Sequence, residues 1–159
     1  MYTPADYTIL VVDDEPGIQR MLADYLDDEG FATLVADSGL EALRLLRTEC
    51  PDLVLLDAMM PGFVDGFGVL DTMRDFGLLS VTPVILVTAI ADTARVMAAI
   101  RLGIVDYVVK PFKLADVSVR VKKVLRGRTP RTSHGTRVDD NPEEARTVAA
   151  HVARQEPMG

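Results

Sequence analysis

The fold is decided by the stretch from Ile9 to Pro16, ILVVDDEP, in which four apolar residues run directly into three acidic ones. Four more short apolar runs follow along the chain. Together the five runs are Ile9–Val12, Phe31–Val35, Leu53–Leu56, Val84–Val87 and Tyr107–Val109. Runs that are apolar at every position, rather than at alternate ones, are typical of strands in a parallel sheet that is covered on both faces.

Amphipathic helical patterns alternate with these runs. They predict helices over residues 16–29, 38–46, 66–76, 92–103 and 114–125, with Ser38 and Asp92 as N-caps and Gly30 just past the end of the first helix. Strand followed by helix, five times over, predicts an α/β fold with a doubly wound parallel sheet and helices on both faces. In such folds the ligand site lies at the carboxyl ends of the strands.

Polar residues follow the predicted strands at these carboxyl ends. They are the acidic run Asp13–Glu15, Asp57, Thr88 and Lys110. Clustered carboxylates repel one another unless a cation neutralises them, and oxygen ligands without His or Cys suit Mg²⁺. A Lys and a Thr opposite them can hold phosphoryl oxygens, and an Asp beside a metal can act as a nucleophile. The residues themselves thus predict a divalent-metal site that handles phosphate.

Four motifs occur in order at the strand ends: Asp13–Pro16, Leu55–Pro61, Val87–Ala89 and Asp106–Phe112. In these motifs the chain resembles the receiver domain of two-component response regulators, the CheY-like superfamily. The resemblance covers about Thr8 to Arg126. It implies a flavodoxin-like, five-stranded parallel sheet with the strand order 2-1-3-4-5.

The resemblance also implies a phosphorylation site. Asp57 would accept a phosphoryl group from a sensor histidine kinase or a phosphotransfer protein. Mg²⁺ would be held by Asp13, Asp14 and Asp57 together with the backbone carbonyl of Met59.

Three further positions take roles from the same resemblance. Lys110 would pair with the phosphoryl group, and the Lys110–Pro111 peptide bond would be cis. Thr88 would move to hydrogen-bond the phosphoryl group, and Tyr107 would rotate inward. The changed surface would act on an unknown output partner, or support a homodimer through the face of the fourth helix, fifth strand and fifth helix, on or near which Asp106 and Arg120 lie.

One turn departs from the family pattern. The family usually has two residues between the Pro of its Met-Pro motif and the next acid, whereas Gly62, Phe63 and Val64 make three between Pro61 and Asp65. This extra residue lies beside the predicted phosphorylation site, where it could change kinase recognition or dephosphorylation without removing a chemical group.

Charge and composition along the chain indicate its domain organisation, its partners and its location. All of the formal net charge of −7 falls in residues 1–126, which argues against direct nucleic-acid binding by this segment. We expect a receiver domain over residues 1–126, a flexible linker over 127–141 and a short helical tail over 142–159, which could begin an output region. The sequence shows no targeting or membrane segment, and its single cysteine forms no disulfide framework, so we expect a cytoplasmic protein.

Other functions fit parts of the pattern. A metal-dependent phosphatase with an Asp nucleophile would usually have a second acid where Met59 stands, and a flavodoxin-type flavin or nucleotide binder would need backbone donors in place of Asp13–Glu15. A degenerate receiver that only docks a partner is a fourth possibility. The acidic run could also be a solvated loop, and Tyr107 a structural tyrosine.

Overall fold

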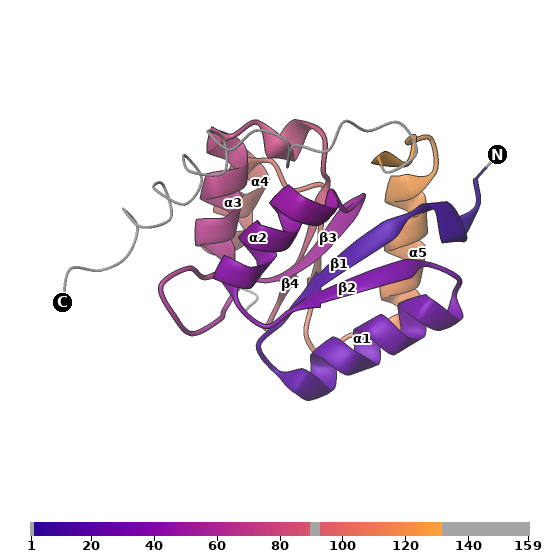
Figure 1. Cartoon of the computed structure of the whole chain (residues 1–159). Helices are drawn as coiled ribbons and strands as arrows, with labels where there is room; N and C mark the ends of the chain where they lie inside the picture. The colour runs from indigo at the N-terminus through magenta and orange to yellow at the C-terminus, as the bar shows by residue number, and fades with distance from the viewer. Residues whose placement is uncertain (1, 90–92, 132–159) are drawn as a thin grey trace.

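The protein, described by a computed structural model over residues 2–89 and 93–131, is a five-stranded parallel sheet between two layers of helices (Figure 1). The strand order is β2-β1-β3-β4-β5, as the resemblance implies. The strands are β1 (Thr8–Val12), β2 (Ala32–Ala36), β3 (Leu53–Asp57), β4 (Val84–Thr88) and β5 (Asp106–Val109). The helices are α1 (Pro16–Asp28), α2 (Gly39–Glu49), α3 (Gly66–Asp75), α4 (Thr93–Leu102) and α5 (Leu114–Leu125).

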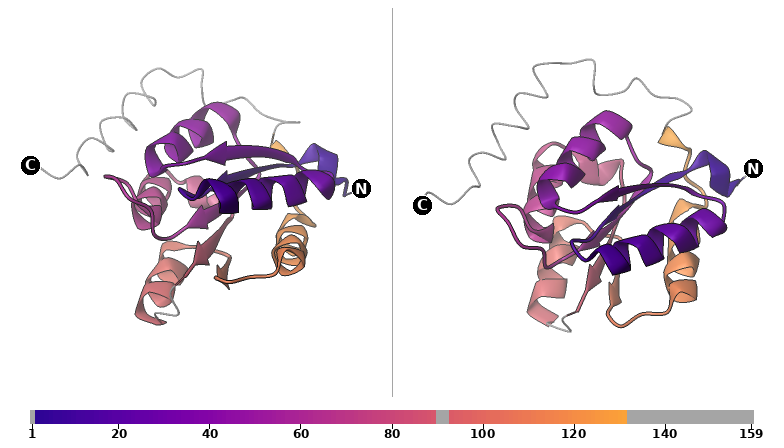
Figure 2. Two further views of the ribbon diagram at one scale, coloured as in Figure 1. Left: turned by 90° about the horizontal axis from the view of Figure 1, so that it is seen from below. Right: turned by 60° about the horizontal axis from the view of Figure 1, so that its bottom comes forward.

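The inner strands β1, β3 and β4 are buried on both faces because they are apolar at nearly every position, whereas the edge strands β2 and β5 are partly exposed. In β1, Ile9 and Val11 pack into the core beneath α1 and α5, whereas Leu10 and Val12 pack into the core beneath α2, α3 and α4. Figure 2 shows these two layers of helices on either side of the sheet. The doubly wound fold is confirmed.

The helix ends follow the predicted chemistry where the structure describes them. The Ser38 side chain accepts a hydrogen bond from the Glu41 amide at 3.2 Å, and Gly30 follows α1 with a φ of 101°. The predicted N-cap Asp92 lies outside the described residues. Two short 3₁₀ helices, η1 (Pro4–Asp6) and η2 (Leu78–Ser80), were not predicted.

The predicted linker and tail lie mostly outside the described residues. The part that is described, residues 127–131, keeps contact with the domain through hydrogen bonds to Asp52 and Thr82, so the contacts continue past the predicted boundary at Arg126. Among the helices of the described residues, none combines the length and the apolar character that a membrane crossing requires.

Glycine allows α3 to begin directly against the end of β3. A Cβ atom at Gly66 would lie 2.3 Å from the carbonyl oxygen of Asp57 and 2.8 Å from Cα of Ala58, so the backbones would have to move apart. This contact places the start of α3 beside Asp57, at the carboxyl edge of the sheet.

We therefore expect Gly66→Ala to destabilise the domain by about 1–3 kcal/mol, the usual cost of forcing extra volume into a packed site. Urea unfolding measures the change. Gly17→Ala is the matched control, because a Cβ at Gly17 in α1 has nothing within 4 Å and alanine favours helix. Equal stability of the two variants would contradict the role given to this contact.

Candidate functional site

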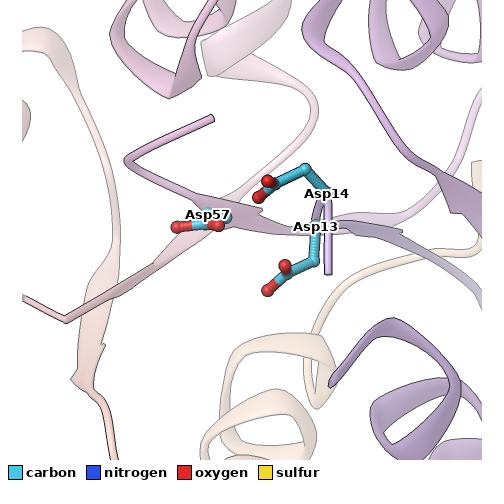
Figure 3. Close-up of side chains that lie close together, drawn as sticks. All are labelled: Asp13, Asp14 and Asp57. Carbon is cyan, nitrogen blue, oxygen red and sulfur yellow. The ribbon is translucent and has the colours of Figure 1, made fainter. Parts of the chain in front are cut away.

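The site lies at the carboxyl edge of the sheet, where three acidic side chains converge. Asp13 and Asp14 directly follow β1, and Asp57 is the last residue of β3, which pairs with β1. One carboxylate oxygen of each lies within 4.8 Å of the others, and Figure 3 shows the three side chains at this edge. Asp13 and Asp57 are buried, so their charges are poorly screened by water.

Lys110 provides the opposing charge. It follows β5, and its Nζ lies 3.1 Å from Oδ2 of Asp13 and 3.6 Å from Oδ2 of Asp57. Burial lowers the pKa of the Lys110 ammonium, but its hydrogen bond to Asp13 and the charges of Asp57 and Asp13 more than offset this, so its pKa is raised above the ordinary value. The Lys110 side chain therefore stays protonated and positively charged beside the Asp57 carboxylate.

Asp57 has an unusual proton affinity. Burial raises the pKa of its carboxyl group to about 6, helped by the charges of Asp13 and Asp14 and opposed by the Met59 amide and by Lys110. The Met59 N–H donates to Asp57 Oδ1 at 3.1 Å. Ionised Asp57 is thus held in one orientation, and its charge is only partly compensated by the protein.

Backbone and side-chain contacts hold the acidic run in place. The Glu15 amide donates to Oδ1 of Asp13 at 2.9 Å. The Gln19 side chain, one turn into α1, donates to the backbone carbonyls of Asp13 at 3.3 Å and of Ala36 at 3.0 Å. Gln19 was not among the predicted site residues, although it follows the acidic run by a single helical turn.

The other predicted residues also lie at or near this edge. Thr88 is the buried last residue of β4, one position beyond Val87, which pairs with Asp57. The Lys110–Pro111 bond is cis, and the Lys110 amide donates to the Thr88 carbonyl at 2.7 Å. Tyr107 in β5 is exposed.

The turn with the extra residue is anchored where it leads into α3. Val64 is buried against the start of α2, and the Asp65 side chain caps α3 by accepting from the Gly68 amide at 2.9 Å. Phe63 is left exposed between Pro61 and Val64. Pro61 and Gly62 are exposed as well, so the extra length of the turn lies on the surface, beside the site.

Arg95 of α4 also contacts the turn after β3, and the sequence did not indicate this contact. Its guanidinium lies 2.8 Å from the Met59 sulfur and 5.9 Å from the centre of the Phe67 ring. No local pattern pairs residues this far apart in the chain.

The donor set fits a hard divalent cation. Among the described residues, three carboxylates cluster together, two of them buried, and the Lys110 ammonium contacts Asp13 and Asp57. Mg²⁺ is commonly held by one or two carboxylates with further oxygens from water or phosphate. Binding there would offset the repulsion that contributes to the raised pKa of Asp57.

The response regulator receiver domain family matches residues 9–122 of this chain. The chain belongs to this family and carries the receiver domain of a two-component response regulator, a signalling switch. This membership favours the switch over the phosphatase and the flavodoxin-type binder considered from the sequence.

Relatives and solved structures agree with this assignment. The chain is 42% identical over 118 residues to the probable transcriptional regulator ycf27 of Guillardia theta (74% of this chain, 45% of that protein). It is 44% identical over 119 residues to the DNA-binding response regulator MtrA of Mycolicibacterium smegmatis (74% and 50%). The receiver domain of the Francisella response regulator 1452 superposes with a TM-score of 0.71 at 32% identity, covering 76% of this chain and 97% of that one.

The chain spans about half the length of the curated relatives it matches. A second solved structure, the receiver domain of NtrX from Brucella abortus, gives a TM-score of 0.69 at 32% identity and covers 76% of this chain and 99% of that one. The similarity to solved structures therefore extends over a whole isolated receiver domain.

The raised pKa of Asp57 predicts a pH-dependent stability without metal. The unfolded carboxyl group titrates near 3.8 and the folded one near 6, so the folded state binds more protons between these values and stability falls as pH rises through them. Above pH 6, ionised Asp57 lowers the free energy of unfolding by about 3 kcal/mol. Asp57→Asn removes this ionisable group, so in EDTA the variant should be more stable than wild type at pH 7.5 and equally stable at pH 4.

Urea unfolding at both pH values checks this prediction, with Asp24→Asn as a control that removes an exposed acid of α1. Adding Mg²⁺ at pH 7.5 should stabilise wild type more than Asp57→Asn and narrow the difference. If Asp57→Asn is more stable than wild type by as much at pH 4 as at pH 7.5, ionisation of Asp57 is not the cause of the added stability.

Proposed function

We propose that Asp57 accepts a phosphoryl group from a sensor histidine kinase or a phosphotransfer protein, and that this changes the surface offered to an output partner. The observation that carries the proposal is the position of Lys110 Nζ, within 3.6 Å of Asp57 Oδ2 and 3.1 Å of Asp13 Oδ2. A cation beside a buried, oriented carboxylate suits transfer of a group that brings negative charge of its own.

Asp57, Lys110 and Met59 would have different roles in the phosphoryl transfer. A carboxylate oxygen of Asp57 forms a bond to phosphorus while the bond from phosphorus to the donor's imidazole nitrogen breaks. Lys110 then pairs with the phosphoryl oxygens and is drawn from its contact with Asp57. The amide of Met59 keeps the carboxylate oriented.

Asp13, Asp14, Asp57 and the Met59 carbonyl would hold Mg²⁺. Bound there, the ion supplies positive charge that offsets the incoming phosphoryl charge. Within residues 2–89 and 93–131, three carboxylates share one lysine, and this excess of negative charge supports the need for a cation.

The switch would involve Thr88 and Tyr107. We infer that the Thr88 hydroxyl moves to hydrogen-bond the phosphoryl group and that the Tyr107 ring turns inward. The exposed position of Tyr107 is the starting state that such a movement requires. Phosphorylation would thus bias two existing arrangements of the same face.

The output is inferred from the relatives. Their names describe transcriptional and DNA-binding regulators, and we infer that this chain also controls transcription, in the cytoplasm, through another domain or protein. The acidic balance of residues 1–126 disfavours nucleic-acid contact by the receiver itself.

Acetyl phosphate tests the proposed phosphorylation directly. With Mg²⁺ we expect intact-protein mass spectrometry to show one added phosphoryl group, and with EDTA or in Asp57→Asn we expect none. Lys110→Ala removes the ammonium that would pair with the phosphoryl oxygens. It should therefore reduce the extent of phosphorylation, or the conformational change that follows it, by about tenfold or more.

Lys113→Ala controls for the loss of a positive charge near β5, because Lys113 is exposed and outside the carboxylate cluster. Modification of Asp57→Asn at the wild-type level would refute the assignment of the acceptor. Absence of any modification in wild type would favour a receiver that only docks its partner.

We further propose that phosphorylation promotes a homodimer through the face of α4, β5 and α5. In the described protomer, Arg120 already binds both carboxylate oxygens of Asp106, at 2.8 and 2.9 Å, and contacts Asp116 at 3.2 Å. Exposed Ile100 and Tyr107 supply apolar surface beside these charges. A dimer would use the same face in both copies.

Sedimentation velocity with and without acetyl phosphate checks this proposal. Ile100→Glu should weaken the phosphorylated dimer about tenfold or more by placing a charge in its apolar surface. Met21→Glu on α1 is the matched control, since Met21 is 42% exposed and Ile100 45%. A phosphorylated wild type that remains monomeric at all concentrations would exclude the dimer.

A further inference from the structure

The chain does not leave the domain at the end of α5. Residues 127–131, which we call the strap, run from the end of α5 to the amino edge of the sheet, where they bind residues that precede β3 and β4. Gly127, with a φ of 89°, allows the turn out of the helix. Figures 1 and 2 both show this end of α5 beside the N-terminal segment.

Asp52 is the centre of the contact. It precedes β3, is only 4% exposed, and uses both carboxylate oxygens. Oδ2 accepts from the Thr8 amide at 2.7 Å, and Oδ1 accepts from the Arg131 amide at 2.6 Å. A buried carboxylate needs such donors, and the strap supplies one of them.

Thr82 gives the strap a second anchor. It lies two residues before β4, is fully buried, and its hydroxyl accepts from the Arg131 guanidinium at 2.6 Å. Arg131 therefore reaches residues that precede two inner strands, Asp52 before β3 through its backbone and Thr82 before β4 through its side chain.

The N-terminal segment holds the other end of the strap. The hydroxyl of buried Tyr7 donates to the backbone carbonyl of Arg128. The Arg126 guanidinium lies 5.7 Å from the centre of the Tyr2 ring, which in turn contacts the Tyr7 ring at 5.5 Å between centres. Contacts at both ends make the strap a part of the folded domain.

We propose that Asp52, Thr82 and Tyr7 form a docking site for the strap, and that this site fixes the point from which the chain continues past Arg131. That point lies at the amino edge of the sheet, a full strand length from Asp57. The contacts described for the strap are with Asp52, Thr82 and Tyr7 and lie away from the carboxylate cluster, so the strap stays docked in both the phosphorylated and the unphosphorylated protein. The signal then reaches a partner through the surface of the domain and not through release of the strap.

Amide exchange in the 159-residue chain tests this proposal, with NMR or mass spectrometry following the Arg131 amide. In wild type we expect clear protection, unchanged within about twofold after treatment with acetyl phosphate and Mg²⁺. Thr82→Val keeps the side-chain shape but removes the acceptor for Arg131, and Tyr7→Phe removes only the hydroxyl. Each should speed exchange of the Arg131 amide about fivefold or more.

Arg128→Ala is the matched control: it removes an equal charge from the strap, and among the described contacts only its backbone is used. In Arg128→Ala the Arg131 amide should exchange at the wild-type rate. Arg131→Gln tests the same anchor without altering the buried threonine, should Thr82→Val disturb folding. Acetyl phosphate should still modify every variant, so a failure here is distinguishable from a failure of the proposed phosphorylation.

Three results would overturn the proposal. The first is an Arg131 amide that exchanges in wild type at the rate of an unfolded peptide. The second is unchanged protection in Tyr7→Phe, Thr82→Val and Arg131→Gln alike. The third is loss of protection on phosphorylation, which would make the strap a released element instead of a fixed one.

Discussion

Negative charge concentrated at the carboxyl edge of a sheet buried on both faces is the constraint on which the rest of the structure depends. Parallel strands bring Asp13, Asp14 and Asp57 to one place, and the burial of Asp13 and Asp57 keeps water from screening those two charges. Burial raises the pKa of Asp57, and the neighbouring acids add to this because Lys110 offsets only part of their charge. The same excess of negative charge makes this edge of the sheet suited to a divalent cation.

The two ends of the inner strands differ in how well their buried charges are balanced. At the carboxyl end the charges are incompletely balanced, and a bound group can shift the arrangement. At the amino end the Asp52 carboxylate has a backbone donor for each oxygen, and one of the donors comes from the strap.

The sequence predicted what depends on short-range pattern and on order along the chain. Uniformly apolar runs such as Leu53–Leu56 indicated a sheet covered on both faces, and the residues following each run indicated the site. Contacts between distant segments escaped prediction. Nothing near Asp52 or Thr82 in the chain indicates Arg131, and the linker composition of residues 127–131 suggested flexibility. Arg95 and Met59 likewise meet only because α4 packs beside the turn after β3.

The burial of Val64 against the start of α2 couples two parts of the chain that no motif connects. A Cβ atom at Gly39 would lie 2.2 Å from the Val64 carbonyl oxygen and 2.8 Å from Cγ1 of its side chain. A side chain at position 39 is therefore compatible only with a different path for the turn after β3. Among receivers that share this longer turn, positions 39 and 64 should covary, and a change of turn length should be accompanied by a change at the start of α2.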